Sequence, residues 1–154
     1  MLHSSVHVTK YFYLTKKKEQ HLEFDVDLAI KKNKNNPIYY IQYAHARITK
    51  IINDLDNASF EKDNLNNLNT KNEIELIELI NSFQNVMDKA INTVRPDIIT
   101  NYLYKVAQTF HSYYAETKII ASSIKGEKVS LIKCIDKIII SGLKVLDIKP
   151  MDRM

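Results

Sequence analysis

The stretch NPIYYIQYAHARI, residues 36–48, decides how this sequence folds. Asn36 is a good helix N-cap, and Pro37 fits the first helical position, where its missing N–H is not needed for hydrogen bonding. Apolar side chains then recur at helical spacing, at Ile41, Ala44, Ile48, Ile51 and Ile52. We therefore predict an amphipathic helix from Pro37 to about Leu55.

The flank of this helix carries aromatic rings beside a cation. At about 100° per residue, the side chains on this flank are those of Tyr39, Tyr40, Tyr43 and Arg47. Phenol rings stack on nucleic-acid bases, and a guanidinium binds phosphates or base edges. The flank is therefore a candidate RNA-binding surface. The same spacing also fits tyrosines at the edge of a core and an arginine in solvent.

The composition favours a single all-α domain. The chain has 154 residues, of which 45% are hydrophobic and 26% charged, and this is enough for one core. Its two glycines, Gly126 and Gly142, are isolated. Rossmann and P-loop phosphate sites need clustered glycines, so the sequence excludes both. A net charge of +4 and a pI of about 9.0 favour association with polyanions without identifying one.

The cysteine content and the hydropathy argue against a disulfide-bonded, zinc-binding or membrane protein. The single cysteine, Cys134, lies in an apolar stretch, and we expect it to be buried. One cysteine forms neither an intrachain disulfide nor a cysteine zinc cluster, so we expect no metal site. We see no signal peptide and no apolar run that would span a bilayer, and we expect a cytoplasmic protein without a membrane partner.

The chain predicts a bundle of about four main helices after an N-terminal lead-in. We assign residues 1–30 to a linker with a short helical region from about Asp27, and residues 31–154 to the helical domain. Residues 56–72 are rich in Asn and Asp and predict a loop, with a helical turn near Phe60.

Three further helices are expected after this loop. The first starts near Glu73 and ends at Arg95-Pro96, because a residue before proline avoids the α region. Its predicted buried stripe is Ile74, Ile77, Ile80, Phe83, Met87, Ala90, Ile91 and Val94. The next begins at Pro96 and continues to about Ile120. The last carries apolar residues from 129 to 146, before Pro150.

Several segments resemble, in the same order, the anticodon-binding domain of the arginyl-tRNA synthetase family. Residues 36–48 are similar to its opening signature, NPxYYxQYAHARI, and residues 6–29 to the segment that joins it to the catalytic domain. Residues 95–108, 110–114 and 142–154 resemble three further elements, including the family's C-terminus. The departures from the family pattern are His111 and Ser112 in place of Asn and its neighbour, Asp147 in place of Gly, and Asp97 in place of His.

The resemblance implies recognition of the anticodon of tRNA(Arg). Arginine codons share a middle G, so their tRNAs share a middle anticodon C, which requires a stacking surface and polar groups for its Watson–Crick edge. The implied anticodon pocket consists of Tyr40, Tyr43, Arg47, Tyr113, Tyr114 and Met154. Candidates for phosphate contacts, or simply for a solvated face, are Lys16, Lys17, Lys31 and Lys32. For Gln42 and His45 we prefer hydrogen bonds to a neighbouring helix over RNA contacts.

The motifs of the family's catalytic half are absent from this sequence. That half binds ATP and Mg through HIGH-type and KMSKS-type motifs, and neither occurs here. We therefore expect a non-catalytic monomer without a cofactor of its own, which acts with tRNA(Arg) and with a catalytic half in cis or in trans. Two alternatives remain: a stand-alone tRNA-binding paralogue, and a remnant whose aromatic flank packs on a protein partner.

Overall fold

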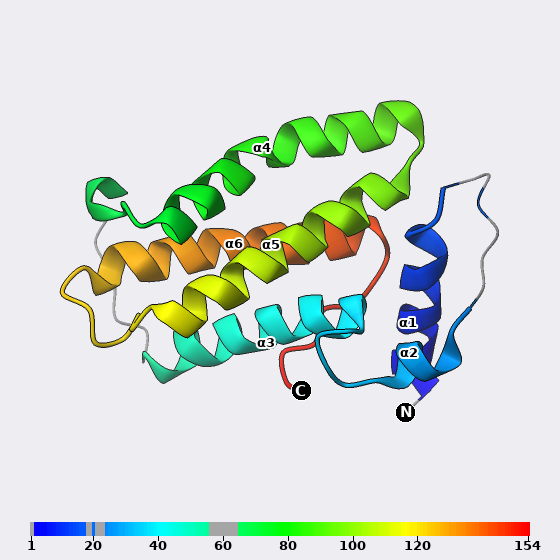
Figure 1. The fold of residues 1–154 in the computed structure, drawn as a ribbon, viewed down its shortest axis with the longest axis horizontal. Helices are drawn as coiled ribbons and strands as arrows, with labels where there is room; N and C mark the ends of the chain where they lie inside the picture. The colour runs from blue at the N-terminus through cyan, green and yellow to red at the C-terminus, as the bar shows by residue number, and fades with distance from the viewer. Residues whose placement is uncertain (1, 18–19, 21–23, 56–64) are drawn as a thin grey trace.

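The computed structural model describes residues 2–17, 20, 24–55 and 65–154, which form a bundle of long helices with one helix across its end (Figure 1). The described elements are α1 (Leu2–Leu14), α2 (Val26–Ile30), α3 (Pro37–Asp54), the 3-10 helix η1 (Leu65–Asn67), α4 (Lys71–Thr93), α5 (Pro96–Glu116) and α6 (Lys125–Val145). No strand occurs in these ranges, and the predicted all-α fold with four main helices is confirmed. The helical turn expected near Phe60 lies outside the described residues.

The start of α3 is built as its sequence predicts. The side-chain oxygen of Asn36 accepts a hydrogen bond from the backbone N–H of Tyr39 at 3.4 Å, and Pro37 occupies the first turn. The amide nitrogen of Asn36 also donates to the carbonyls of Ala29 and Lys31, at 2.9 Å each. Asn36 therefore caps α3 and ties α2 to it. The apolar stripe packs into the core through Ile41, Ala44, Ile48 and Ile51.

Helix α4 forms as predicted, but part of its expected stripe faces solvent. Ile74, Ile91 and Val94 are 47%, 65% and 85% exposed, so the prediction that they are buried is wrong. The buried positions are Glu73, Leu76, Met87 and Ala90. Ile74 and Ile91 each follow a buried position by one residue, which is about 100° around the helix. Val94 ends the helix in the left-handed conformation, at φ 52°.

Helices α5 and α6 complete the core, and Cys134 lies outside it. All the apolar positions predicted for α6 are buried, namely Val129, Ile132, Ile135, Ile139, Leu143 and Leu146. Cys134 is exposed, which contradicts the expected burial. It follows the buried Ile132 by two positions, and a rotation of about 200° carries its side chain to the opposite face of α6.

The described part of the lead-in contains a helix that the sequence did not predict, α1. Helix α1 stands across the end of the bundle and packs on α5 and α2 (Figure 1). Tyr11 is 1% exposed and its hydroxyl donates to the carbonyl of Thr100 at 3.3 Å, while Phe12 packs beside it. We predicted a helix only from about Asp27, and the polar start of α1 hid this first one. No helix in the described ranges combines the length and apolarity that a membrane crossing requires.

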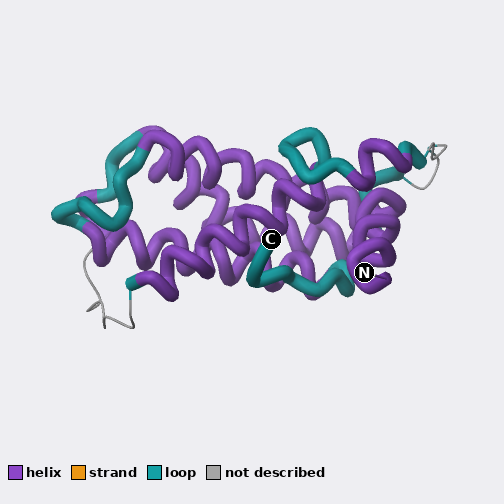
Figure 2. The backbone as a smooth tube through the Cα atoms, turned by 90° about the horizontal axis from the view of Figure 1, so that it is seen from below, coloured by secondary structure: helices purple, strands orange, loops and turns teal. Residues whose placement is uncertain are grey.

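The turn after α6 contains one of the positions at which this sequence departs from the family pattern. Asp147, where the family usually has glycine, has a φ of 53°, in the left-handed region that favours glycine. Its carboxylate forms an ion pair with Lys10 of α1. The turn sends the C-terminal tail, residues 149–154, back along the bundle, as Figure 2 shows.

Candidate RNA-binding surface

A cluster of half-buried aromatic rings lies where α3 and α5 pack together. The ring of Tyr43 lies nearly parallel to those of Tyr39 and His111, with centroids 6.1 Å and 5.4 Å away and interplanar angles of 14° and 20°. The ring of Tyr40 lies 4.3 Å from that of His111, centroid to centroid, and also contacts Tyr104. The structure thus joins side chains from two helices into one stack whose rings are partly open to solvent.

Arg47 contacts one of these rings, Tyr43, and the further ring of Tyr114 on α5. Its guanidinium carbon is 4.6 Å from the ring centroid of Tyr43 and 4.3 Å from that of Tyr114, and it donates a hydrogen bond to the Tyr43 hydroxyl. Both contacts are cation–π interactions, which hold the charge in place without neutralising it. Among the described residues, no carboxylate forms an ion pair with Arg47. The cation is therefore oriented and remains available to an anion or a base edge.

His111 is a member of the cluster that the sequence did not assign to it. Its Nε2–H donates to the carbonyl of Tyr40 at 3.1 Å. Burial lowers the pKa of His111, and the nearby charge of Arg47 lowers it further, although the bond to the Tyr40 carbonyl opposes both. The neutral ring is favoured, so it adds a stacking surface rather than a second cation. Its departure from the family's usual Asn was the available signal.

Met154 and two of the candidate lysines lie around a neighbouring apolar groove. The groove has a volume of about 510 Å³ and is bounded by α1, α2, the start of α3 and the C-terminal tail. Its lining includes Tyr39, Lys31, Lys32, Met151 and Met154. Tyr39 also stacks on Tyr43, so the groove and the aromatic cluster share this residue. Met154 is 49% exposed there.

The other candidate lysines lie elsewhere. Lys16 and Lys17 follow the end of α1 and are exposed. The charge of Lys17 acts on Asp97, at the connection between α4 and α5, where Arg95 pairs with the same carboxylate. Lys31 and Lys32 therefore lie beside the aromatic surface, whereas Lys16 and Lys17 do not line the groove.

Tyr113 does not join the predicted pocket. It is 0% exposed, and its hydroxyl donates to the carboxylate of Glu73 at 3.2 Å, between α5 and α4. One position later on α5, Tyr114 turns toward Arg47. Residues 113 and 114 therefore contribute one ring to the core and one to the surface, and Tyr113 is a packing residue in this structure.

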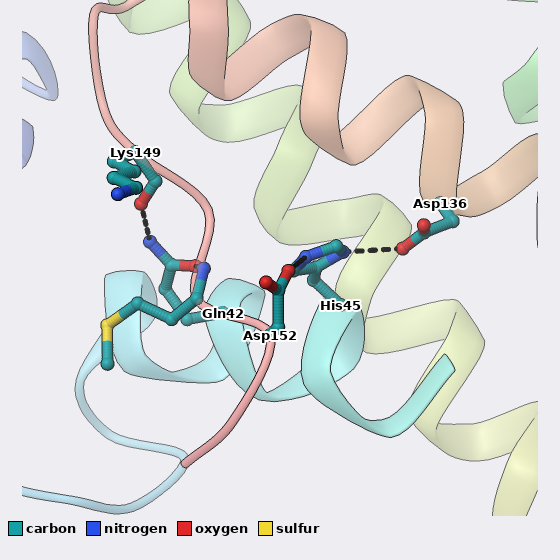
Figure 3. Close-up of polar contacts among 6 residues, drawn as sticks. Gln42, His45, Asp136, Lys149 and Asp152 are labelled. Carbon is teal, nitrogen blue, oxygen red and sulfur yellow. Dashed lines mark hydrogen bonds and ion pairs between the residues drawn. The ribbon is translucent and has the colours of Figure 1, made fainter. Parts of the chain in front are cut away.

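Gln42 and His45 both bond to the protein itself: His45 to a neighbouring helix, as we preferred, and Gln42 to the backbone of the C-terminal tail instead of a helix. His45 is bonded to Asp136 on α6, and both side chains also reach the C-terminal tail, as Figure 3 shows. Gln42 is 3% exposed and His45 is 3% exposed. These two residues of α3 lie under the tail that carries Met154.

Comparison with known proteins supports the resemblance. Residues 41–154 match the family described as the DALR anticodon binding domain. An arginine–tRNA ligase of Ureaplasma parvum serovar 3 is 36% identical over 149 residues, covering 94% of this chain and 26% of that protein. The arginine–tRNA ligase of Geobacter metallireducens is 35% identical over 153 residues, covering 95% and 27%. The chain thus spans about a quarter of the length of these relatives.

Solved structures share the fold. A putative arginyl-tRNA synthetase from Campylobacter jejuni aligns with a TM-score of 0.81 at 27% identity, covering 96% of this chain and 33% of that one. The arginyl-tRNA synthetase of Thermus thermophilus aligns with a TM-score of 0.87 at 18% identity, covering 99% and 27%. At that identity the second match shows the fold alone.

Proposed function

Because this chain belongs to the DALR anticodon binding domain family, we propose that it recognises the anticodon of tRNA(Arg) through the surface that Tyr43, Arg47 and Tyr114 build. The observation that carries this proposal is the guanidinium of Arg47 between two partly exposed rings, 4.6 Å and 4.3 Å from their centroids. An unpaired base requires a flat surface to stack on and a polar group at its edge, and this site offers both.

The neighbouring groups fit the same use. Tyr39, Tyr40 and His111 extend the flat surface, and Met154 lines the neighbouring groove that shares Tyr39 with it. Lys31 and Lys32, on the rim of that groove, are suited to phosphates of the same RNA loop. Phosphate contacts add affinity without sequence information, so discrimination would rest on the rings and Arg47.

We also propose that the chemical step belongs to a catalytic part beyond these 154 residues. The relatives are about four times as long, and the catalytic motifs of the family do not occur in this sequence. That part would use ATP and Mg, act in cis or in trans, and work in the cytoplasm. The helical domain would hold the anticodon loop while the acceptor end reaches the separate site.

The proposal is tested by measuring binding to a tRNA(Arg) anticodon stem-loop at physiological salt. Changing the middle anticodon base from C to G should weaken binding strongly. Arg47→Ala should cost about 1–3 kcal/mol, as expected for a side chain that contacts a base. Lys50→Ala is the matched control, because Lys50 is an exposed cation on the same helix. Equal losses for the two variants would reduce the role of Arg47 to nonspecific charge.

A second measurement separates this function from the alternatives. The chain is added to an arginyl-tRNA synthetase that lacks its C-terminal domain, and aminoacylation of tRNA(Arg) is followed. Restored activity supports the proposed function. Selective RNA binding without restoration favours a stand-alone tRNA-binding paralogue. A chain that neither binds the RNA selectively nor restores aminoacylation would favour a remnant that binds a protein partner.

A further inference from the structure

The C-terminal tail is fixed to α3 by the side-chain amide of Gln42. Its Nε2–H donates to the carbonyl of Lys149 at 2.9 Å, and its Oε1 accepts from the backbone N–H of Met151 at 2.8 Å. One amide thus pairs with the backbone on both sides of Pro150. These two bonds hold the first part of the tail in register on α3.

His45, one turn further along α3, holds the rest of the tail (Figure 3). Its Nδ1 lies 2.7 Å from a carboxylate oxygen of Asp136 on α6, and its Nε2 lies 3.1 Å from one of Asp152 in the tail. An ionised carboxylate only accepts hydrogen bonds. Both ring nitrogens must therefore carry a proton, and the bridge requires the imidazolium form of His45.

The two carboxylates differ in how firmly they hold the ring. Asp136 has the shorter bond and a side chain 14% exposed, whereas the side chain of Asp152 is 79% exposed. When His45 loses a proton, the N–H toward Asp136 is the one retained. Nε2 then presents a lone pair to the carboxylate of Asp152, and the attraction becomes a repulsion.

The charged groups around the ring favour its protonated form. Burial by itself lowers the pKa of His45, but the hydrogen bonds and charges of Asp136 and Asp152 outweigh it, so the pKa is raised above 6.5. From the other neighbouring helix, α5, His111 lies against Tyr40 and Tyr43. A raised pKa means that the bridge is intact below 6.5 and is lost as pH rises through the pKa of the folded protein.

The bridge governs the end of the chain. Asp152 is two residues before Met154, and Met151 and Met154 both line the groove beside Tyr39. We propose that Gln42 and His45 are positioning residues for the anticodon surface, and that protonated His45 latches the tail, so that Met154 is docked while His45 is an imidazolium facing the ionised Asp152 and is released when His45 loses that proton. The effect on RNA rests on the proposed function, whereas the latch itself does not.

The latch is tested without RNA by NMR of the full chain labelled at the methionine methyl groups. As pH rises, the Met154 methyl signal should move toward its random-coil position, with the same midpoint pH as the His45 ring carbon signal. The Met151 methyl signal should stay in place, because Gln42 holds the backbone of Met151 at every pH. Asp152→Ala should leave the Met154 signal near random coil at every pH. Asp152→Asn should keep the tail docked and remove the pH dependence, because an amide donates to neutral Nε2 and accepts from the protonated form.

Asp54→Ala is the control for charge, since Asp54 is an exposed carboxylate at the end of α3. It should titrate like the wild type. Two outcomes would overturn the latch. One is a Met154 signal that is the same in the wild type and in Asp152→Ala, and the other is a pH transition that persists in Asp152→Asn. Because loss of one tail contact leaves the core intact, misfolding of these variants would be seen in the other methyl signals.

Binding of the anticodon stem-loop then tests the positioning role. Asp152→Ala should weaken binding roughly threefold to tenfold, because the RNA must then immobilise the tail itself. Asp152→Asn should bind like the wild type below the midpoint pH measured for the His45 ring, and it should not show the decline in binding above that midpoint. If Arg47→Ala weakens binding but Asp152→Ala does not, the positioning role is wrong and the proposed function stands. If neither variant changes binding, the proposed function fails, and the methyl signals alone decide the latch.

Discussion

At the scale of single residues, the protonation of His111 affects the stability of the fold, and its ring belongs to the aromatic cluster of α3 and α5. Its ring lies 4.3 Å from Tyr40 and 5.4 Å from Tyr43, and burial together with the charge of Arg47 keeps its pKa below 6.5. The folded protein therefore binds a proton at His111 less readily than the unfolded chain does. This contribution to stability is present above 6.5 and is lost as pH falls through the lower pKa of the folded state.

We therefore expect the free energy of unfolding to fall as the pH drops below 6.5, partly through His111. His111→Asn introduces an amide that does not titrate, so the variant should show a flatter dependence in this range, whatever its absolute stability. Urea unfolding at a series of pH values between about 5 and 7 measures this pH dependence of the free energy of unfolding. The range lies above the one in which ordinary carboxylates titrate. His45 acts in the opposite window, above 6.5. Identical slopes in variant and wild type would assign the effect to other groups.

At the scale of helices, α5 and α6 approach each other through Gly142. A Cβ at this position would lie 2.6 Å and 3.0 Å from the two terminal carbons of Leu103, which is itself 0% exposed. Leu103 has no solvent-filled space to move into. Gly142→Ala should therefore destabilise the protein by about 1–3 kcal/mol through overpacking, partly offset by the better helix propensity of alanine.

Gly126→Ala, in the first turn of the same helix, is the matched control. There the gain in propensity should dominate, so the melting temperature should stay the same or rise while that of Gly142→Ala falls. A Gly142→Ala protein as stable as the wild type would show that the two helices separate easily.

The helices also show what the sequence could and could not predict. Asn36, Pro37 and the apolar spacing of α3 are local signals, and they predicted that helix correctly. Tyr43 and Arg47, one turn apart, were found for the same reason. The burial of Glu73 was not predicted, because its carboxylate accepts from the Thr70 backbone N–H and from Tyr113, 40 residues away.

The same limit applies to the site. Which ring of the 113–114 pair faces Arg47 depends on the rotation of α5 in the bundle, and the sequence alone does not fix it. The carboxylates that hold His45 are 91 and 107 residues away. Periodicity finds residues that share a helix face, whereas contacts between distant segments need the assembled fold.

At the scale of the whole molecule, helix α1 and the C-terminal tail, which lie far apart in the sequence, border the same groove beside the start of α3. Figure 1 shows α1 across the end of the bundle and the tail running back along α3. Helix α1 packs on α5, Lys10 pairs with Asp147 after α6, and the groove beside Tyr39 is lined by residues of α1 and of the tail. The groove thus exists only when the lead-in is folded. The lead-in is therefore part of the structure that presents Met154.

This arrangement predicts that α1 unfolds together with the bundle. Tyr11→Ala should lower the free energy of unfolding by about 3–5 kcal/mol, because it removes a large buried ring and its bond to Thr100. Tyr13→Ala, on the same helix with a side chain 61% exposed, should change it by less than about 0.5 kcal/mol. Urea denaturation followed by circular dichroism measures both variants. If the two are equally stable, α1 is only loosely attached, and the groove and the position of Met154 would then depend on what the lead-in joins in a longer protein.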